Sequence, residues 1–317
     1  MMKRIFLVFI FLVSSVFANE SIFNSVIKNV SIPDTQKTID DAKKLQSNLT
    51  NSNFKEFIKS WKKVEAIYLA GEIDSDYLDT PRYIDVFNNL KEDLNSQMQR
   101  VIESKSDVKT ALFKNSFKTV NALEYVLFSS QKMNDRQIEI SKEILNSIIS
   151  KLEEIKEVYE NYLKNSDGEE DEVEYNAKLI NTLIASTYRL KEWRIGNPGG
   201  FSVKYKNDAK NNRAEYFLSQ SSFDAIDAIL DAQKELISNQ KYSNLINLAK
   251  SKNAASDLEL VSLKIDEAKK ELKNLKKDDF SDSKKLFDLS SQIHDLYYIT
   301  IIEKLGLKPN ILDADGD

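Results

Sequence analysis

Apolar residues return every three or four positions along most of this chain, and this spacing restricts its fold more than any other feature. Such a period places apolar side chains on one face of an α-helix, whereas a half-buried strand alternates at every second residue. Only seven Gly and four Pro interrupt the 317 residues. One such stripe consists of Phe54, Phe57, Ile58, Trp61, Val64 and Tyr68. We therefore expect an all-α protein of about eight to ten helices, packed as two helical-bundle lobes.

A short acidic stretch near the middle of the chain suggests where the two lobes meet in the sequence. It follows a long apolar stripe, carries Gly168 and lacks apolar periodicity. Charged segments of this kind are typical of exposed linkers. We predict an N-terminal bundle over residues 19–165, an acidic linker at 166–174 and a C-terminal bundle over 175–317.

Glycine and proline mark further boundaries. The stretch from Gly196 to Arg213 holds three of the seven glycines together with Pro198. A long loop in a helical protein is either functional or a surface excursion, and both interpretations stay open. Asp34, directly after Pro33, predicts a helix start, and Gly306 predicts a helix end.

Residues 1–18 have the pattern of a secretory signal peptide. Lys3 and Arg4 precede an apolar stretch over residues 5–17, and small residues allow cleavage after Ala18. We therefore expect a periplasmic protein. It should not be a lipoprotein, because the chain has no Cys to carry the lipid. No second apolar run of spanning length follows, so we expect no integral membrane segment after cleavage.

Composition excludes several classes of function. The chain has 50 acidic and 45 basic residues, and loss of Lys3 and Arg4 would make the mature protein more acidic. Nucleic acid is therefore not an expected partner, since phosphate binding needs a basic face. Without Cys there are no disulfides, thiolate metal sites or thiol nucleophiles. The single histidine, His294, is interpreted as a structural helix residue, so a conventional zinc hydrolase or Ser-His-Asp triad is not expected.

Oxygen ligands remain for any metal chemistry. Carboxylates, amide carbonyls and the 13 tyrosines can bind hard cations, so the cofactor, though unidentified, would be a cation such as iron or calcium. The segment from Asp313 to Asp317 begins like a calcium-binding EF-hand loop. That loop needs a Glu at its twelfth position, and the chain stops at the fifth, so we interpret the segment as an acidic tail.

Four segments together resemble the imelysin family of helical proteins from the bacterial envelope. They are Trp61-Lys-Lys-Val-Glu-Ala-Ile-Tyr68, Asn121-Ala-Leu-Glu124-Tyr-Val-Leu-Phe128, Tyr188-Arg-Leu-Lys-Glu-Trp-Arg-Ile-Gly-Asn-Pro-Gly-Gly200 and the closing Leu305 to Asp317 with its Asp-Gly-Asp end. The resemblance implies two similar helical bundles with a site at their interface, an envelope location and a link to iron uptake. Members have been labelled metallopeptidases, but the resemblance supplies no proteolytic mechanism.

The second of these segments departs from the family's Gly-x-His-x-x-Glu signature. Thr119 stands where Gly is expected and Asn121 where His is expected, and only Glu124 is kept. Positions 121 and 124 lie one helical turn apart, so both side chains can point at one spot. Asn with Glu makes a weaker and harder ligand set than His with Glu. The other interpretation is that Glu124 is a hydrogen-bonded polar residue between the bundles.

We therefore predict a binding site between the lobes and assign no catalytic residue. Its members are Trp61, Asn121, Glu124, Tyr125, Arg194 and Gly199, with Glu124 as the candidate metal ligand. The favoured function is that of a non-enzymatic periplasmic binding or accessory protein linked to iron or metal uptake. A metal-dependent peptidase is the alternative, disfavoured because the ligand histidines are missing. A structural or adaptor bundle that binds another envelope protein is the third interpretation.

Overall fold

The computed structural model describes residues 20–88, 91–166 and 171–309, and within these ranges every regular element is helical. The prediction of an all-α fold is therefore confirmed. Helical runs of nine residues or more cover 22–47, 51–66, 94–103, 120–128, 135–165, 172–199, 222–237, 255–274 and 284–304. Residues 1–18, the proposed leader, and the tail from Asp313 to Asp317 lie outside the described residues.

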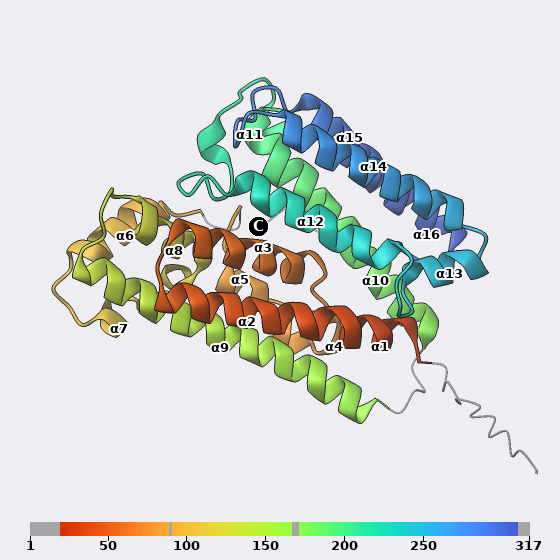
Figure 1. Cartoon of the computed structure of the whole chain (residues 1–317), viewed down its shortest axis with the longest axis horizontal. Coiled ribbons are helices and arrows are strands. Elements are labelled where there is room, and N and C mark those ends of the chain that lie inside the picture. Colours follow the sequence, from red (N-terminus) through yellow and green to blue (C-terminus); the bar gives the residue numbers. More distant parts are fainter. Residues whose placement is uncertain (1–19, 89–90, 167–170, 310–317) are drawn as a thin grey trace, which may run out of the picture.

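The first half of the chain packs around the long continuous helix that covers residues 22–47. α1, the π-helical η1 and α2 run on from one another, and α2 lies between α3 and α9 (Figure 1). The apolar stripe predicted for residues 54–64 is the buried face of α3. The bounds in this half are α1 Ile22–Val26, η1 Ile27–Ser31, α2 Ile32–Ser47, α3 Asn51–Ala66, α4 Ala70–Ile73, η2 Ser75–Tyr77, α5 Thr80–Ile84, α6 Leu94–Glu103, α7 Val108–Ala111, η3 Asn115–Lys118, α8 Val120–Phe128 and α9 Asp135–Asn165.

The helix start predicted at Asp34 is wrong. The helix begins at Ile22, where the side chain of Ser21 caps it, and Asp34 lies inside the continuous run. The π turn in η1 explains why Pro33 does not end the helix. The N–H of Ile32 donates to the carbonyl of Ile27, five residues back. Pro33, which has no N–H, therefore follows a turn in which the usual four-residue spacing is already broken.

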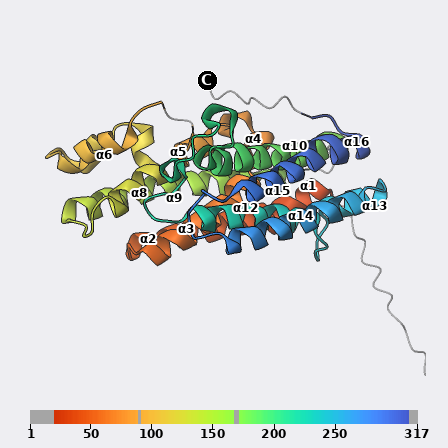
Figure 2. The same cartoon turned by 90° about the horizontal axis from the view of Figure 1, so that it is seen from above.

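The second half is a layer of helices that lie side by side along the long axis (Figure 2). α10 continues through a second π segment, η4, into α11, and α15 continues through η7 into α16. The helix ends before Gly306, which adopts a φ of +69° as the predicted helix end requires. The bounds are α10 Glu172–Arg189, η4 Leu190–Gly196, α11 Asn197–Gly199, η5 Val203–Tyr205, η6 Asn211–Arg213, α12 Ser222–Ile237, α13 Leu245–Ser251, α14 Ala255–Asn274, α15 Lys284–Asp295, η7 Leu296–Ile301 and α16 Ile302–Lys304.

The two halves meet where α12 lies along α3 (Figure 1). We call this contact the seam. α9 ends at Asn165 and α10 begins at Glu172, whereas residues 167–170 are outside the described ranges. The division into lobes at 166–174 stays a prediction. Among the helices that the structure describes, none is both long and apolar enough to span a membrane.

The glycine-rich stretch after η4 folds back against the second half. Gly200 has a φ of +72°, and a Cβ there would lie 2.7 Å from the backbone nitrogen of Ala209. Only glycine fits this close approach without strain. The turn allows Asn197 to face the first half, where its side-chain amide donates to the side chain of Asn88 at 3.3 Å.

Candidate functional site

A buried group of charged side chains lies at the seam, and Lys62 is at its centre. Lys62 belongs to α3 and is fully buried. Its ammonium Nζ donates to three carboxylates, those of Glu65 at 2.6 Å, Asp85 at 2.8 Å and Glu215 at 2.6 Å. These acids come from α3, from the residue after α5 and from the segment before α12. We call Lys62, Glu65, Asp85, Arg194 and Glu215 the seam cluster.

Arg194 closes the cluster from the second half of the chain. Its Nε donates to Glu215 at 2.7 Å, and its Nη2 donates to both carboxylate oxygens of Glu65 at 2.8 Å. Arg194 lies in η4, and π segments of this kind often occur at functional sites. The guanidinium thus joins α3 to the segment before α12 through charge-assisted hydrogen bonds, the stronger class of such bonds.

Asp85 is held by more than the ammonium. Its Oδ2 accepts from the indole Nε1 of Trp61 at 3.2 Å and from the hydroxyl of Tyr216 at 2.6 Å. Its Oδ1 accepts from the backbone N–H of Phe87 at 2.9 Å. Tyr216 has a φ of +58°, which is unusual for an aromatic residue and marks a locally strained turn. That turn places Glu215 and the Tyr216 hydroxyl on the same cluster.

The cluster's charges are set by burial acting against close ion pairs. Burial alone would lower the pKa of Lys62, but the three carboxylates raise it above its usual value. Burial likewise opposes the ionisation of Asp85, yet Lys62 and the hydrogen bonds hold the pKa of Asp85 far below its ordinary range. For Glu215 burial prevails and its pKa is raised, although Arg194 and Lys62 act against it. The cluster thus contains three acids and only two cations. This excess of carboxylates favours the charged forms of Lys62 and Arg194.

Glu124 lies beside the cluster and not within it. The residue is only 8% exposed, and its Oε1 accepts from the backbone N–H of Ser219 at 2.9 Å and from the Ser219 hydroxyl at 2.7 Å. Burial raises the pKa of Glu124 to about 7, and the nearby acids Glu215 and Asp85 add to the rise. Glu124 therefore ties α8 to the segment before α12, across the seam.

The other predicted site residues are placed as follows. The Oδ1 of Asn121 accepts from the backbone N–H of Val86 at 2.7 Å, so Asn121 positions the residue next to Asp85. The hydroxyl of Tyr125 donates to Gln99 at 3.0 Å on the surface. A Cβ on Gly199 would meet Phe201 and Ser283. Arg194 therefore belongs to the cluster and Trp61 contacts it. Glu124 and Asn121 border it, and Tyr125 and Gly199 have other neighbours.

Sequence reasoning missed Lys62, Asp85, Glu215 and Tyr216. The sequence does contain a signal for Lys62. This lysine lies four residues after Ile58 and three before Glu65, next to the apolar stripe of α3. A lysine on such a face needs buried partners. No comparable signal marks Asp85 or Glu215 among 50 acids.

His294 is buried in α15, and its ring stacks on Tyr298 with centroids 5.7 Å apart. Burial lowers the pKa of His294, and Lys191 lowers it further. The ring lies near Tyr188, Tyr298, Lys191 and Asp295, none of which belongs to the seam cluster.

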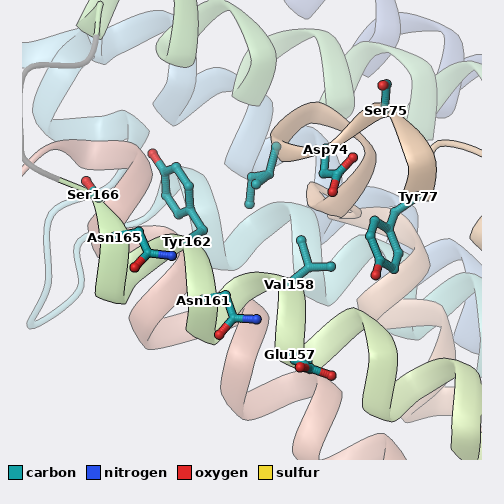
Figure 3. A pocket seen from close by; sticks show the side chains of 10 residues that line it. Asp74, Ser75, Tyr77, Glu157, Val158, Asn161, Tyr162, Asn165 and Ser166 are labelled. Atoms are coloured by element: carbon teal, nitrogen blue, oxygen red, sulfur yellow. The ribbon is translucent and has the colours of Figure 1, made fainter.

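A separate surface pocket of about 650 Å³ lies between the end of α9 and the segment formed by α4 and η2 (Figure 3). Glu157 and Asn161 of α9 line one wall, and Asp74 and Tyr77 line the other. None of the six predicted site residues lines this pocket. It is therefore distinct from the seam.

Comparison with known proteins identifies the family. The family model for imelysin (peptidase M75) matches residues 31–298. The chain belongs to the imelysin family. Two solved structures share its fold. An imelysin-like protein from Psychrobacter arcticum 273-4 has a TM-score of 0.74 at 14% identity, with 91% of this chain and 96% of that chain covered. A protein from Parabacteroides distasonis ATCC 8503, assigned as an iron-regulated protein A precursor, has a TM-score of 0.64 at 14% identity, with 90% and 92% covered. No curated protein matches the chain.

The peptidase label of the imelysin family implies a metal, and the seam offers a donor set that can be tested for it. Carboxylate oxygens of Glu65, Asp85 and Glu215 lie within 4.8 Å of one another. Each of these acids already accepts from Lys62. A divalent ion about 3 Å from that ammonium would be repelled by on the order of 10 kcal/mol at an effective dielectric constant of about 20. With Lys62 in place, these residues do not fit a metal ion. A metal at Glu124 stays a prediction.

Replacing Glu124 by Gln should change how stability depends on pH. The folded state binds the Glu124 proton more tightly than the unfolded state, whose pKa is near 4.5. The stabilising effect of the proton is complete below that value and is lost as the pH rises through about 7. Between pH 5 and pH 8 the wild-type free energy of unfolding should therefore fall by about 2–3 kcal/mol relative to Glu124→Gln.

Urea unfolding of both proteins at several pH values measures this difference. Asp34, whose pKa burial raises to about 6, titrates in the same window but is present in both proteins and cancels. Parallel pH profiles for the two proteins would show that folding does not raise the pKa of Glu124.

Proposed function

We propose that this imelysin-family chain is an exported periplasmic protein that serves iron acquisition as a non-enzymatic binding or accessory protein. The signal-peptide pattern of residues 1–18 supports export. The family match supports an imelysin-type role. The iron link is supported by the name given to the structural neighbour from Parabacteroides distasonis.

The observation that carries the non-enzymatic part is the closed charge network at the seam. Peptide hydrolysis needs an activated nucleophile or a metal-bound water with a free coordination position. All three acids of the seam cluster are instead ion-paired with Lys62, and Glu65 and Glu215 are also paired with Arg194. Glu124 is held by Ser219 through two hydrogen bonds. Side chains engaged in this way support a structural or binding role for the seam.

Peptidase activity is the first test. The purified mature protein is incubated with unfolded casein and Zn²⁺, Mn²⁺ or Fe²⁺, and we expect no cleavage. The matched variant is Glu124→Gln, which keeps an acceptor for Ser219 but cannot act as a base. Cleavage by the wild type that is lost in Glu124→Gln would contradict the proposal and favour the metal-dependent peptidase.

Export and the iron link are tested in the native cell. Mass spectrometry of the periplasmic fraction should find a mature N-terminus at Asn19. A strain that lacks the gene should grow more slowly than its parent when iron is chelated, and the wild-type gene should restore growth. Equal growth of both strains under chelation would contradict the iron role. A partner captured by the protein with unchanged iron-limited growth would favour the adaptor interpretation.

A further inference from the structure

The seam cluster has the arrangement of a cation site, and the chain itself supplies the cation. An ammonium has three N–H donors, and Lys62 directs them at three separate carboxylates at 2.6 to 2.8 Å. Its Nζ also lies 5.2 Å from the ring centre of Tyr216, which adds a cation–π contact. All donors of the fully buried ammonium are therefore used within the cluster.

The surroundings of the carboxylates are fixed from both halves of the chain. Asp85 is held by Trp61, Tyr216 and Phe87, and the neighbouring Val86 is held by Asn121. Arg194 binds both oxygens of Glu65 and the Glu215 oxygen that Lys62 leaves free. A carboxylate set fixed by so many contacts should keep its shape when the central ammonium is removed.

We propose that the ammonium of Lys62 is the resident cation of this centre in place of a metal ion, and that Glu65, Asp85 and Glu215 form a latent site for a hard cation that opens only when Lys62 is removed. Carboxylate oxygens suit hard cations such as Mn²⁺ or a lanthanide. In the wild type an incoming ion would have to displace a buried, triply bonded ammonium and would face Arg194 as well. The inference concerns the centre alone and does not depend on export or on the iron link.

Terbium luminescence tests the latent site, because Trp61 lies beside Asp85 and can sensitise a bound Tb³⁺. The variant is Lys62→Ser, which leaves room for an ion and its water. We expect one saturable, Trp-sensitised site in Lys62→Ser, with affinity at least about tenfold above that of the wild type. Lys63→Ser, a change at the next residue of α3, is the matched control and should behave like the wild type. Tyr216 also contacts Asp85 and can sensitise Tb³⁺, so excitation is set at the red edge of the absorption band, where only tryptophan absorbs. Under that excitation, adding Trp61→Phe to Lys62→Ser should remove the emission and so locate the ion at the seam.

Equal sensitised binding by the wild type and Lys62→Ser, lost in both on Trp61→Phe, would overturn the inference. So would a folded Lys62→Ser that binds no Tb³⁺. Circular dichroism reports whether that variant is folded. The growth test of the iron role does not depend on either outcome, so the two proposals fail separately.

A second measurement uses the wild type and does not need a folded variant. A buried ammonium bonded to three carboxylates should exchange its protons slowly and give a lysine ¹⁵N–¹H₃ signal at neutral pH. Loss of the signal in Lys62→Arg assigns it. We expect the signal to persist when one equivalent of Mn²⁺ is added. Its selective broadening at that concentration would show that the ion enters the centre, and absence of the signal would show that the ammonium is not held as proposed.

Discussion

Replacing Lys62 by Met is expected to lower the free energy of unfolding at pH 7.5 by about 3–5 kcal/mol. Met fills a similar volume, so the loss comes from charge and not from a cavity. Three carboxylates within 4.8 Å of one another would then remain, with Arg194 as the direct ion-pair partner of Glu65 and Glu215 and no such partner for Asp85. Some would take up protons, so the loss should shrink as the pH falls toward 5. Urea unfolding at both pH values measures the effect.

The matched control for this change is Lys37→Met. Lys37 pairs with Asp41 on the surface of α2, and its side chain is 63% exposed. Such a pair contributes at most about 1 kcal/mol. Adding Glu215→Gln to Lys62→Met should recover part of the loss, because one carboxylate is removed from the uncompensated set. Equal losses in Lys62→Met and Lys37→Met would show that the central ammonium does not stabilise the seam.

The fold could be predicted because its signal is local. The burial of Phe54, Phe57 and Trp61 follows from a spacing that any helix imposes, wherever it packs. The wrong helix start at Asp34 has a cause that helical periodicity does not reveal. A π turn between Ile27 and Ser31 carries the helix past Pro33, and no simple pattern in the sequence announces such a turn.

The site could be predicted only in part, because its contacts are long-range. Lys62 and Glu215 are 153 positions apart, and the pairing arises where α3 meets the segment before α12. Resemblance to the imelysin family points to Trp61, Arg194 and Glu124, which the structure places in the seam cluster or next to it. That resemblance points to Asn121, where the sequence departs from the family signature, and gives no indication of Lys62. The position of Lys62 beside a buried apolar stripe indicates that it needs buried partners, but the sequence does not identify Asp85 and Glu215 as those partners.

Arg194 should be the second most sensitive residue at the seam, and the shape of its guanidinium should matter as well as its charge. Arg194→Met is expected to lower the free energy of unfolding by about 3–5 kcal/mol at pH 7.5, because Glu65 and Glu215 each lose a buried partner. Arg194→Lys keeps the charge but cannot present Nε to one acid and Nη2 to the other, so a loss of about 1–3 kcal/mol should remain.

Arg82→Met is the control for Arg194, since Arg82 pairs with Asp79 on the surface with its side chain 61% exposed, and it should cost at most about 1 kcal/mol. Urea unfolding of the four proteins separates the two contributions. The difference in unfolding free energy between Arg194→Lys and the wild type measures the contribution of the guanidinium's two-sided hydrogen bonding. The difference between Arg194→Met and Arg194→Lys measures the contribution of the positive charge. If Arg194→Lys matched the wild type, charge alone would hold η4 to α3. If Arg194→Met matched Arg82→Met, the pairing across the seam would not stabilise the fold at all.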